Sequence, residues 1–143
     1  MEMLKKIYVV DKNFGMLFNK RRQSKDSVLI EDIVKKVQDS NGSLWLSDYS
    51  RELFEDKDIP MKNILELNNN AKEEDFLFIE DVDVENFTEE VEFHIYKWDK
   101  VYPADKKFEF PLPSSYEIKE GTTFVGSSHE NIESYVLNVE IKN

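Results

Sequence analysis

The chain of 143 residues contains no cysteine, four glycines, four prolines and two histidines. Without cysteine there is no disulfide, thiol nucleophile or thiolate metal ligand, and two histidines leave little for a zinc site. The sequence has no P-loop, G-x-G-x-x-G, G-x-S-x-G or H-E-x-x-H motif. These absences disfavour the enzyme classes that depend on such devices, and we expect no metal and no cofactor.

Long apolar runs are also missing. The first run, Ile7–Val10, ends at Asp11 and is too short for a signal peptide or a membrane span, so we expect a cytoplasmic protein without a membrane partner. Hydrophobic residues make up 40% of the chain and aromatic residues 13%, which is enough for a core. The length fits one domain, and we predict a single domain over residues 1–143.

Positive charge is scarce, and its distribution is uneven. The net charge is −11, which disfavours nucleic acid and anionic membranes and favours a basic protein partner. Residues 1–38 nevertheless hold nine basic residues against five acidic ones, whereas Glu73–Glu92 holds ten acids and no base. The acidity is therefore polarised along the chain.

Hydrophobic periodicity predicts an α+β fold with a mainly antiparallel sheet and two to four short helices. Ile7–Val10 is a strand that is apolar on both faces, and Gly15 supplies a positive φ to the turn after it. Asp26 or Ser27 caps a helix that ends near Gln38. Val91–Trp98 alternates as a strand. Further strands are expected at 44–46, 76–79, 108–110 (confined to an edge by Pro111 and Pro113) and 122–125, and short helices at 47–54 and 61–67.

The C-terminal segment is ambiguous. Ser127-Ser128-His129-Glu130 has the form of a capping box, and apolar residues continue at helical spacing, which predicts a last helix. Tyr135, Leu137 and Val139 also alternate, so a strand stays open as the alternative.

A basic cluster is the first candidate site. Lys20, Arg21, Arg22 and Lys25 form a possible anion-binding segment for a phosphate or an RNA backbone, the one route by which nucleic acid is expected to bind. The alternative is a solvated loop whose arginines pair with acids of the same chain.

The two histidines are candidates for acid–base chemistry. If the protein is an enzyme, which we do not favour, His129 with Arg21 and Arg22 forms the catalytic trio, as in a phosphodiesterase. The alternative is that His129 belongs to a helix cap. His94 lies in the middle of a strand and is expected to be a sheet residue.

Carboxylates between residues 73 and 90 form the third candidate site. With Phe76, Phe78 and Phe87 between them, they could imitate a phosphate backbone or fill the basic cleft of a nuclease. The alternative is a solvated acidic surface; a calcium loop beginning at Asp81 is disfavoured because Asn86 stands where glycine is required. The candidate partner-binding residues are Glu73, Glu74, Asp75, Glu80, Asp81, Asp83, Glu85, Glu89 and Glu90.

Three segments carry a resemblance to known proteins. Arg21-Arg22-Gln23-Ser24-x-Asp26, Tyr102-Pro103-Ala104-Asp105 and Gly126-Ser127-Ser128-His129-Glu130 resemble a family of short, uncharacterised bacterial proteins. In size and acidity the chain also resembles the immunity proteins of bacterial toxin systems and phage-encoded inhibitors.

The leading hypothesis is therefore an acidic inhibitor or immunity-type protein that blocks a basic toxin or nuclease. The alternative is a small phosphate-ligand-binding protein or ribonuclease-like enzyme that uses Arg21, Arg22 and His129. The sequence leaves the oligomeric state open.

Overall fold

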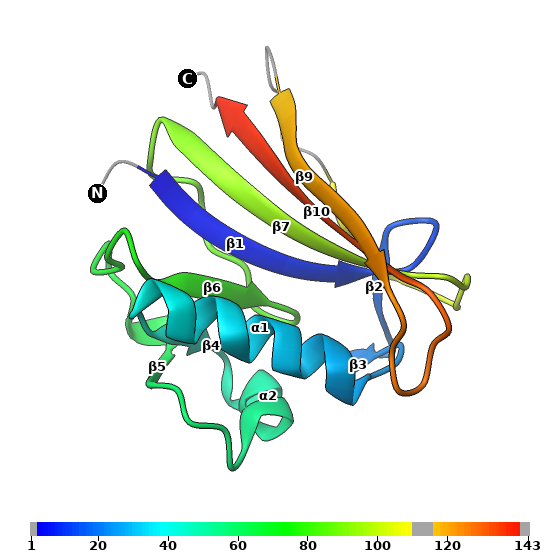
Figure 1. Ribbon diagram of the computed structural model, residues 1–143. Coiled ribbons are helices and arrows are strands. Elements are labelled where there is room, and N and C mark those ends of the chain that lie inside the picture. Colours follow the sequence, from blue (N-terminus) through cyan, green and yellow to red (C-terminus); the bar gives the residue numbers. More distant parts are fainter. Residues whose placement is uncertain (1–2, 110–115, 141–143) are drawn as a thin grey trace.

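The computed structural model describes residues 3–109 and 116–140. Within these residues, seven strands form one large sheet that twists across the molecule (Figure 1). In spatial order they are β5 (Met61–Asn63), β4 (Leu44–Leu46), β6 (Phe76–Ile79), β1 (Met3–Val10), β7 (Glu90–Trp98), β10 (Ile132–Glu140) and β9 (Tyr116–Phe124).

The sheet is mostly parallel, so the prediction of a mainly antiparallel sheet is wrong. β1 pairs in parallel with both β6 and β7, and β4 pairs in parallel with β5 and β6. Among the described strands of this large sheet, antiparallel pairing is confined to the two pairs that β10 makes, with β7 and with β9. The parallel pairing could not be predicted from the sequence, because parallel strands need a crossover connection, which is usually a helix. The connection from β1 to β4 contains the helix Ser27–Ser40, and that from β4 to β5 contains the short helix Asp48–Arg51, but residues 80–89 return from β6 to β7 without a helix.

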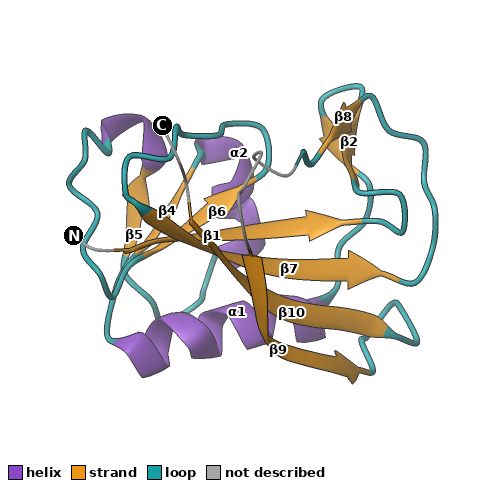
Figure 2. Ribbon diagram, turned by 90° about the horizontal axis from the view of Figure 1, so that it is seen from above, coloured by secondary structure: helices purple, strands orange, loops and turns teal. Residues whose placement is uncertain are grey.

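Helix α1 (Ser27–Ser40) confirms the predicted central helix and its cap. The Asp26 carboxylate accepts hydrogen bonds from the amides of Val28 and Leu29, and Asn41 ends the helix in the left-handed region with φ of 57°. Its buried face packs on one side of the sheet, as Figures 1 and 2 show. No helix in the described ranges is long and apolar enough to cross a membrane.

Each face of the sheet has its own core. On the α1 face, Ile33 and Val37 lie in one buried cluster with Ile7, Phe78 and Tyr96 of the strands. On the opposite face, residues that include Leu4, Tyr8, Val91, Phe93 and Ile95 form a second cluster. The predicted alternation of Val91, Phe93 and Ile95 onto one face is confirmed.

A small second sheet lies beside the carboxyl-terminal part of β1, on the side of the large sheet away from α1 (Figure 2). It consists of β3 (Arg21–Arg22), β2 (Gly15–Phe18) and β8 (Lys106–Lys107), in that order. Asn19 and Lys20 form the two-residue turn between β2 and β3, with φ of 50° and 63°. Positive φ at both positions matches the twist of a tight hairpin.

The shorter elements agree with the sequence in part. The helix expected at 47–54 is confirmed as α2 (Asp48–Arg51), capped by Ser47, followed by the 3-10 helix η1 (Glu52–Phe54). The segment 61–67 is instead the strand β5 followed by the 3-10 helix η2 (Ile64–Glu66). The strand expected at 108–110 is not found at Phe108 and Glu109, which follow a two-residue strand at Lys106–Lys107, and residue 110 lies outside the described residues.

The predicted C-terminal helix is wrong, because residues 132–140 form β10. Nine residues of β10 pair with β7, and eight pair with β9, which outweighs the local helical spacing. Ile132 belongs to the core on the α1 face, whereas Leu137 and Val139 belong to the core on the opposite face.

His94 is buried on the α1 face between two charged partners. The Lys36 ammonium lies 3.0 Å from Nδ1 and can only donate, so Nε2 carries the ring proton and donates to Glu92 at 2.7 Å. Burial lowers the pKa of His94 below 6.5, and the hydrogen bond to Glu92 only partly opposes that effect. The folded protein therefore holds this histidine neutral.

This environment predicts a loss of stability in mild acid. The unfolded chain binds a proton at His94 below about pH 6.5 while the folded chain resists it, so stability falls as the pH drops through that range. Urea unfolding at about pH 7.5 and about pH 5.5 measures the free energy of unfolding at each pH. Between these two pH values the wild type should lose on the order of 1 kcal/mol more of this free energy than His94→Gln loses. Equal losses in the two proteins would contradict this assignment.

Candidate functional site

The buried carboxylate of Asp11, directly after β1, joins three segments of the chain. Its Oδ1 accepts the amides of Asn13 and Gly15 at 2.8 Å each. Its Oδ2 accepts Nε2 of Gln23 at 3.0 Å and the amide of Tyr102 at 2.9 Å. Burial alone would raise the pKa of Asp11, but these four hydrogen bonds outweigh it and lower the pKa. The carboxylate therefore stays charged without a cation beside it.

Gly15 is required for space rather than for its φ. A Cβ built on Gly15 would lie 2.6 Å from both Ala104 Cβ and Gln23 Nε2. The residue with positive φ in this turn is Phe14, at 63°. The expectation that Gly15 supplies the positive φ is therefore wrong, and the glycine instead lets the two loops approach each other.

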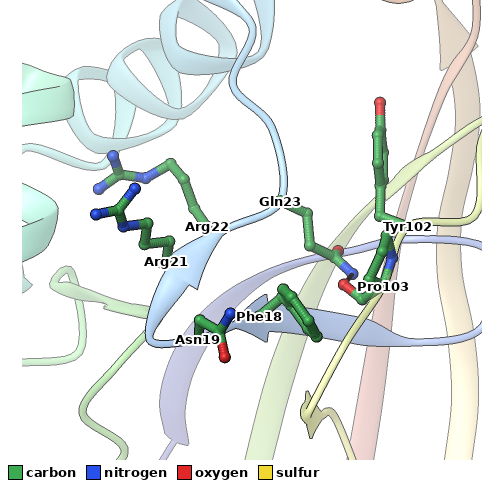
Figure 3. Close-up of a pocket in the computed structure, with 7 residues that line it drawn as sticks. All are labelled: Phe18, Asn19, Arg21, Arg22, Gln23, Tyr102 and Pro103. Atoms are coloured by element: carbon green, nitrogen blue, oxygen red, sulfur yellow. Dashed lines mark hydrogen bonds between the residues drawn. The ribbon is translucent and has the colours of Figure 1, made fainter.

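Residues of the segment 18–23 and the loop at Tyr102 and Pro103 line an open pocket of about 490 Å³, called here the Arg21 pocket. Arg21 and Arg22 extend to one side of β3, whereas Gln23 turns to the other side, where Phe18, Pro103 and Tyr102 also lie (Figure 3). Gln23 Nε2 also donates to the Pro103 carbonyl at 3.2 Å. The lining residues are Phe18, Asn19, Arg21, Arg22, Gln23, Tyr102 and Pro103.

The two arginines of the pocket have different environments. The Arg22 guanidinium makes two hydrogen bonds to Glu80, at 3.0 and 3.1 Å, and one to Glu52 at 2.8 Å. It also lies over the Tyr49 ring, 4.3 Å from the centroid. Arg21 is exposed, and within the described part of the chain no carboxylate pairs with it. Of the two, Arg21 is the cation available to a ligand.

The other candidate cations lie outside the lining of this pocket. Lys20 is exposed in the hairpin turn, and Lys25 lines a separate hollow of about 390 Å³ beside the start of α1. The predicted anion-binding segment is therefore divided by the fold, and only its arginines reach the Arg21 pocket.

His129 lies behind the pocket and is buried. Its Nε2 is 2.8 Å from the Tyr102 hydroxyl, and its Nδ1 is 2.8 Å from Ser128 Oγ. The ring stacks on Trp98 with centroids 4.1 Å apart. Tyr102 lines the Arg21 pocket together with Arg21 and Arg22, but His129 does not line it, and both of its ring nitrogens already have partners. In this geometry His129 positions Tyr102, while its catalytic use stays a prediction.

The segment 127–130, which was expected to begin a C-terminal helix, instead binds the N-terminus of α1. Besides its two helix amides, the buried Asp26 carboxylate accepts the amides of Ser127, Ser128 and His129 at 3.0, 2.7 and 3.2 Å. Burial would raise the pKa of Asp26, but these hydrogen bonds lower it far below its ordinary value. Gly126 permits this contact, because its Cβ would lie 2.3 Å from Asp26 Oδ2.

Several of the nine candidate partner-binding acids bind groups within the chain. Asp75 is buried and accepts the Trp45 indole at 3.0 Å, and Glu80 is buried against Arg22. Asp83 pairs with Lys6 at 2.9 Å, and Asp81 accepts Ser47 Oγ at 2.6 Å. Glu73, Glu85, Glu89 and Glu90 are exposed, and Glu74 is half-buried.

Sequence reasoning missed Asp11, Phe18, Gln23 and Tyr102 as site residues. Gln23 and Tyr102 do belong to two of the segments that carry the resemblance described above, which was the available signal. Nothing local marks Asp11 or Phe18, since their role depends on loops about 90 residues apart.

Comparison with known proteins identifies the fold. No protein family and no curated protein matches the sequence. Among solved structures, the chain is similar to a dihydrofolate reductase from Enterococcus faecalis in complex with NADP(H) and RAB-propyl, with a TM-score of 0.59 and 10% identity over 98% of this chain and 97% of that one. The protein therefore has a dihydrofolate-reductase-like fold, a mixed α/β architecture.

This likeness overturns the leading hypothesis from sequence. The fold resembles that of a dihydrofolate reductase and not that of an immunity protein, phage-encoded inhibitor or toxin-system component, so the prediction of an inhibitor of a basic toxin or nuclease is wrong. The acidic stretch did not indicate a partner-binding surface, because Asp75, Glu80 and Asp83 bind donors of the same chain: Trp45, Arg22 and Lys6.

The residues present do not fit the dinucleotide of that reductase. A dinucleotide pyrophosphate typically lies on a helix N-terminus reached by a glycine-rich turn. Here the Asp26 carboxylate already occupies the N-terminus of α1. The connection after β6, residues 80–89, contains no glycine and five acids. A bound pyrophosphate would face carboxylates where it needs amides.

Replacing Asp11 tests whether its carboxylate organises the pocket. Asp11→Asn leaves one acceptor oxygen for four donors, and its amide would face N–H groups, so we expect a loss of at least about 2 kcal/mol of unfolding free energy. Asp105→Asn is the matched control, because its carboxylate accepts one exposed amide, that of Asn19, and it should cost less than about 1 kcal/mol. Urea unfolding measures both, and similar losses would contradict the assigned role.

Proposed function

We propose that this chain is a small-molecule-binding protein whose Arg21 pocket holds a ligand with an anionic group and a flat ring. The observation that carries the proposal is the exposed guanidinium of Arg21, without a carboxylate partner in the described ranges, at a pocket of about 490 Å³. Pockets of this size are typical of small-molecule sites.

The position of the pocket supports this function. In open α/β sheets, ligands bind beyond the carboxyl ends of the strands, near the point where the strand order reverses. The chain passes from β1 to β4 on one side and later to β7 on the other, so the order reverses at β1. The Arg21 pocket is built by segments tied to Asp11, the residue that follows β1.

The chemistry of the lining indicates the kind of ligand. An arginine fork binds carboxylate or phosphate through two parallel hydrogen bonds. Phe18 is 44% exposed, which leaves a ring face on which a flat ligand can pack. Asn19 and Gln23 add amide groups for orientation. The Enterococcus faecalis protein, in complex with NADP(H) and RAB-propyl, shows that this fold accommodates small molecules.

Removing the charge of Arg21 should weaken binding of an aromatic anion. With benzoate as the probe, Arg21→Gln should raise the Kd about tenfold, since a charge-assisted hydrogen bond contributes about 1.5 kcal/mol. Chemical-shift titration of the full chain by NMR measures the Kd. Lys20→Gln removes the same charge from the adjacent exposed residue and should change the Kd less than about twofold. Equal effects of the two substitutions would refute specific binding by Arg21.

A further inference from the structure

The place where this type of sheet binds a dinucleotide is filled by the protein's own side chains. Glu80 follows β6, the neighbour of β1 at the reversal of strand order, and is buried. Arg22 reaches it from β3 and forms the two-pronged ion pair described above, with the arginine side chain 14% exposed and the glutamate 8%. Ser50 Oγ donates to the same carboxylate at 2.7 Å. The pair is therefore a packed part of the structure and not a surface contact.

Opening this pair would be costly. Burial alone would lower the pKa of Arg22, but its hydrogen bonds to Glu80 and Glu52 outweigh that effect and raise the pKa, so the guanidinium is charged. Separating the buried partners would leave Glu80 as an uncompensated buried charge, which is strongly destabilising. A pyrophosphate that displaced Glu80 would have to overcome this cost, and it would lie beside the acidic connection at residues 80–89.

The charge around the Arg21 pocket also limits its ligand. Arg22 is neutralised by Glu80 and Glu52, and the Asp11 carboxylate is bound only by uncharged donors. Asp105 adds a further carboxylate at the hairpin turn, where it accepts the Asn19 amide at 3.0 Å. Among the residues that line the pocket, Arg21 is therefore the cation without a carboxylate partner in the described ranges, whereas Lys20 lies outside the lining and Lys106 donates to the Glu80 carbonyl. A ligand with one negative charge is balanced by Arg21, whereas a second charge finds no further unpaired cation in the lining.

From this arrangement we infer that the Arg21 pocket selects a singly charged ring ligand, such as an aromatic carboxylate, and that the protein binds no nicotinamide dinucleotide. This inference rests on the proposed function and adds the ligand class to it. The fold of a reductase is thus retained while its dinucleotide crevice is closed by the Arg22–Glu80 pair.

The test compares four probes on the full chain by NMR: benzoate, phenyl phosphate, phenol and NADPH. Benzoate should shift the signals of Phe18, Gln23 and Tyr102 with a Kd in the roughly millimolar range expected for so small a ligand. Phenyl phosphate and phenol should each bind at least about threefold more weakly, and NADPH should leave these signals unchanged.

Failure of the inference and failure of the proposed function give different results. If phenyl phosphate binds more tightly than benzoate, or NADPH shifts the pocket signals, the ligand class is wrong while the pocket is still a binding site. If no probe shifts the signals of Phe18, Gln23 and Tyr102, the proposed function itself is overturned.

Discussion

The buried Asp11 carboxylate is the interaction on which the candidate site depends. It follows the central strand β1 and binds, through four uncharged donors, the turn at Gly15, the Gln23 side chain and the backbone of Tyr102. Charge-assisted hydrogen bonds of this kind are stronger than neutral ones, and a buried acceptor is costly to leave unpaired. One carboxylate thereby fixes the hairpin and the loop that form the two walls of the Arg21 pocket.

Two further buried carboxylates occupy places where a dinucleotide would need free hydrogen-bond donors. Asp26 fills the start of α1, and Glu80 at the end of β6 holds Arg22. A dinucleotide needs free amides and cations in such places. Here they are bound to side chains of the chain itself. Among the described residues that line the pocket, Arg21 is the cation that no carboxylate pairs with. The fold is shared, but function follows the site.

The sequence predicted local structure well and long-range structure poorly. The α1 cap at Asp26, the strands at Leu44–Leu46 and Phe76–Ile79 and the alternation of β7 follow from local residue chemistry. Parallel pairing did not, because the return from β6 to β7 is irregular and shows no helical period. The arginines at 21 and 22 line one pocket, and their use as a site stays a prediction. Their different environments arise from Glu80, about sixty residues away, which no local pattern reveals.

The most direct test of the central claim is a crystal structure of the full chain with benzoate. The account predicts the benzoate carboxylate within hydrogen-bond distance of the Arg21 guanidinium, its ring against Phe18, and the Arg22–Glu80 pair intact. Benzoate bound away from Arg21, or bound only after the Arg22–Glu80 pair has opened, would contradict it.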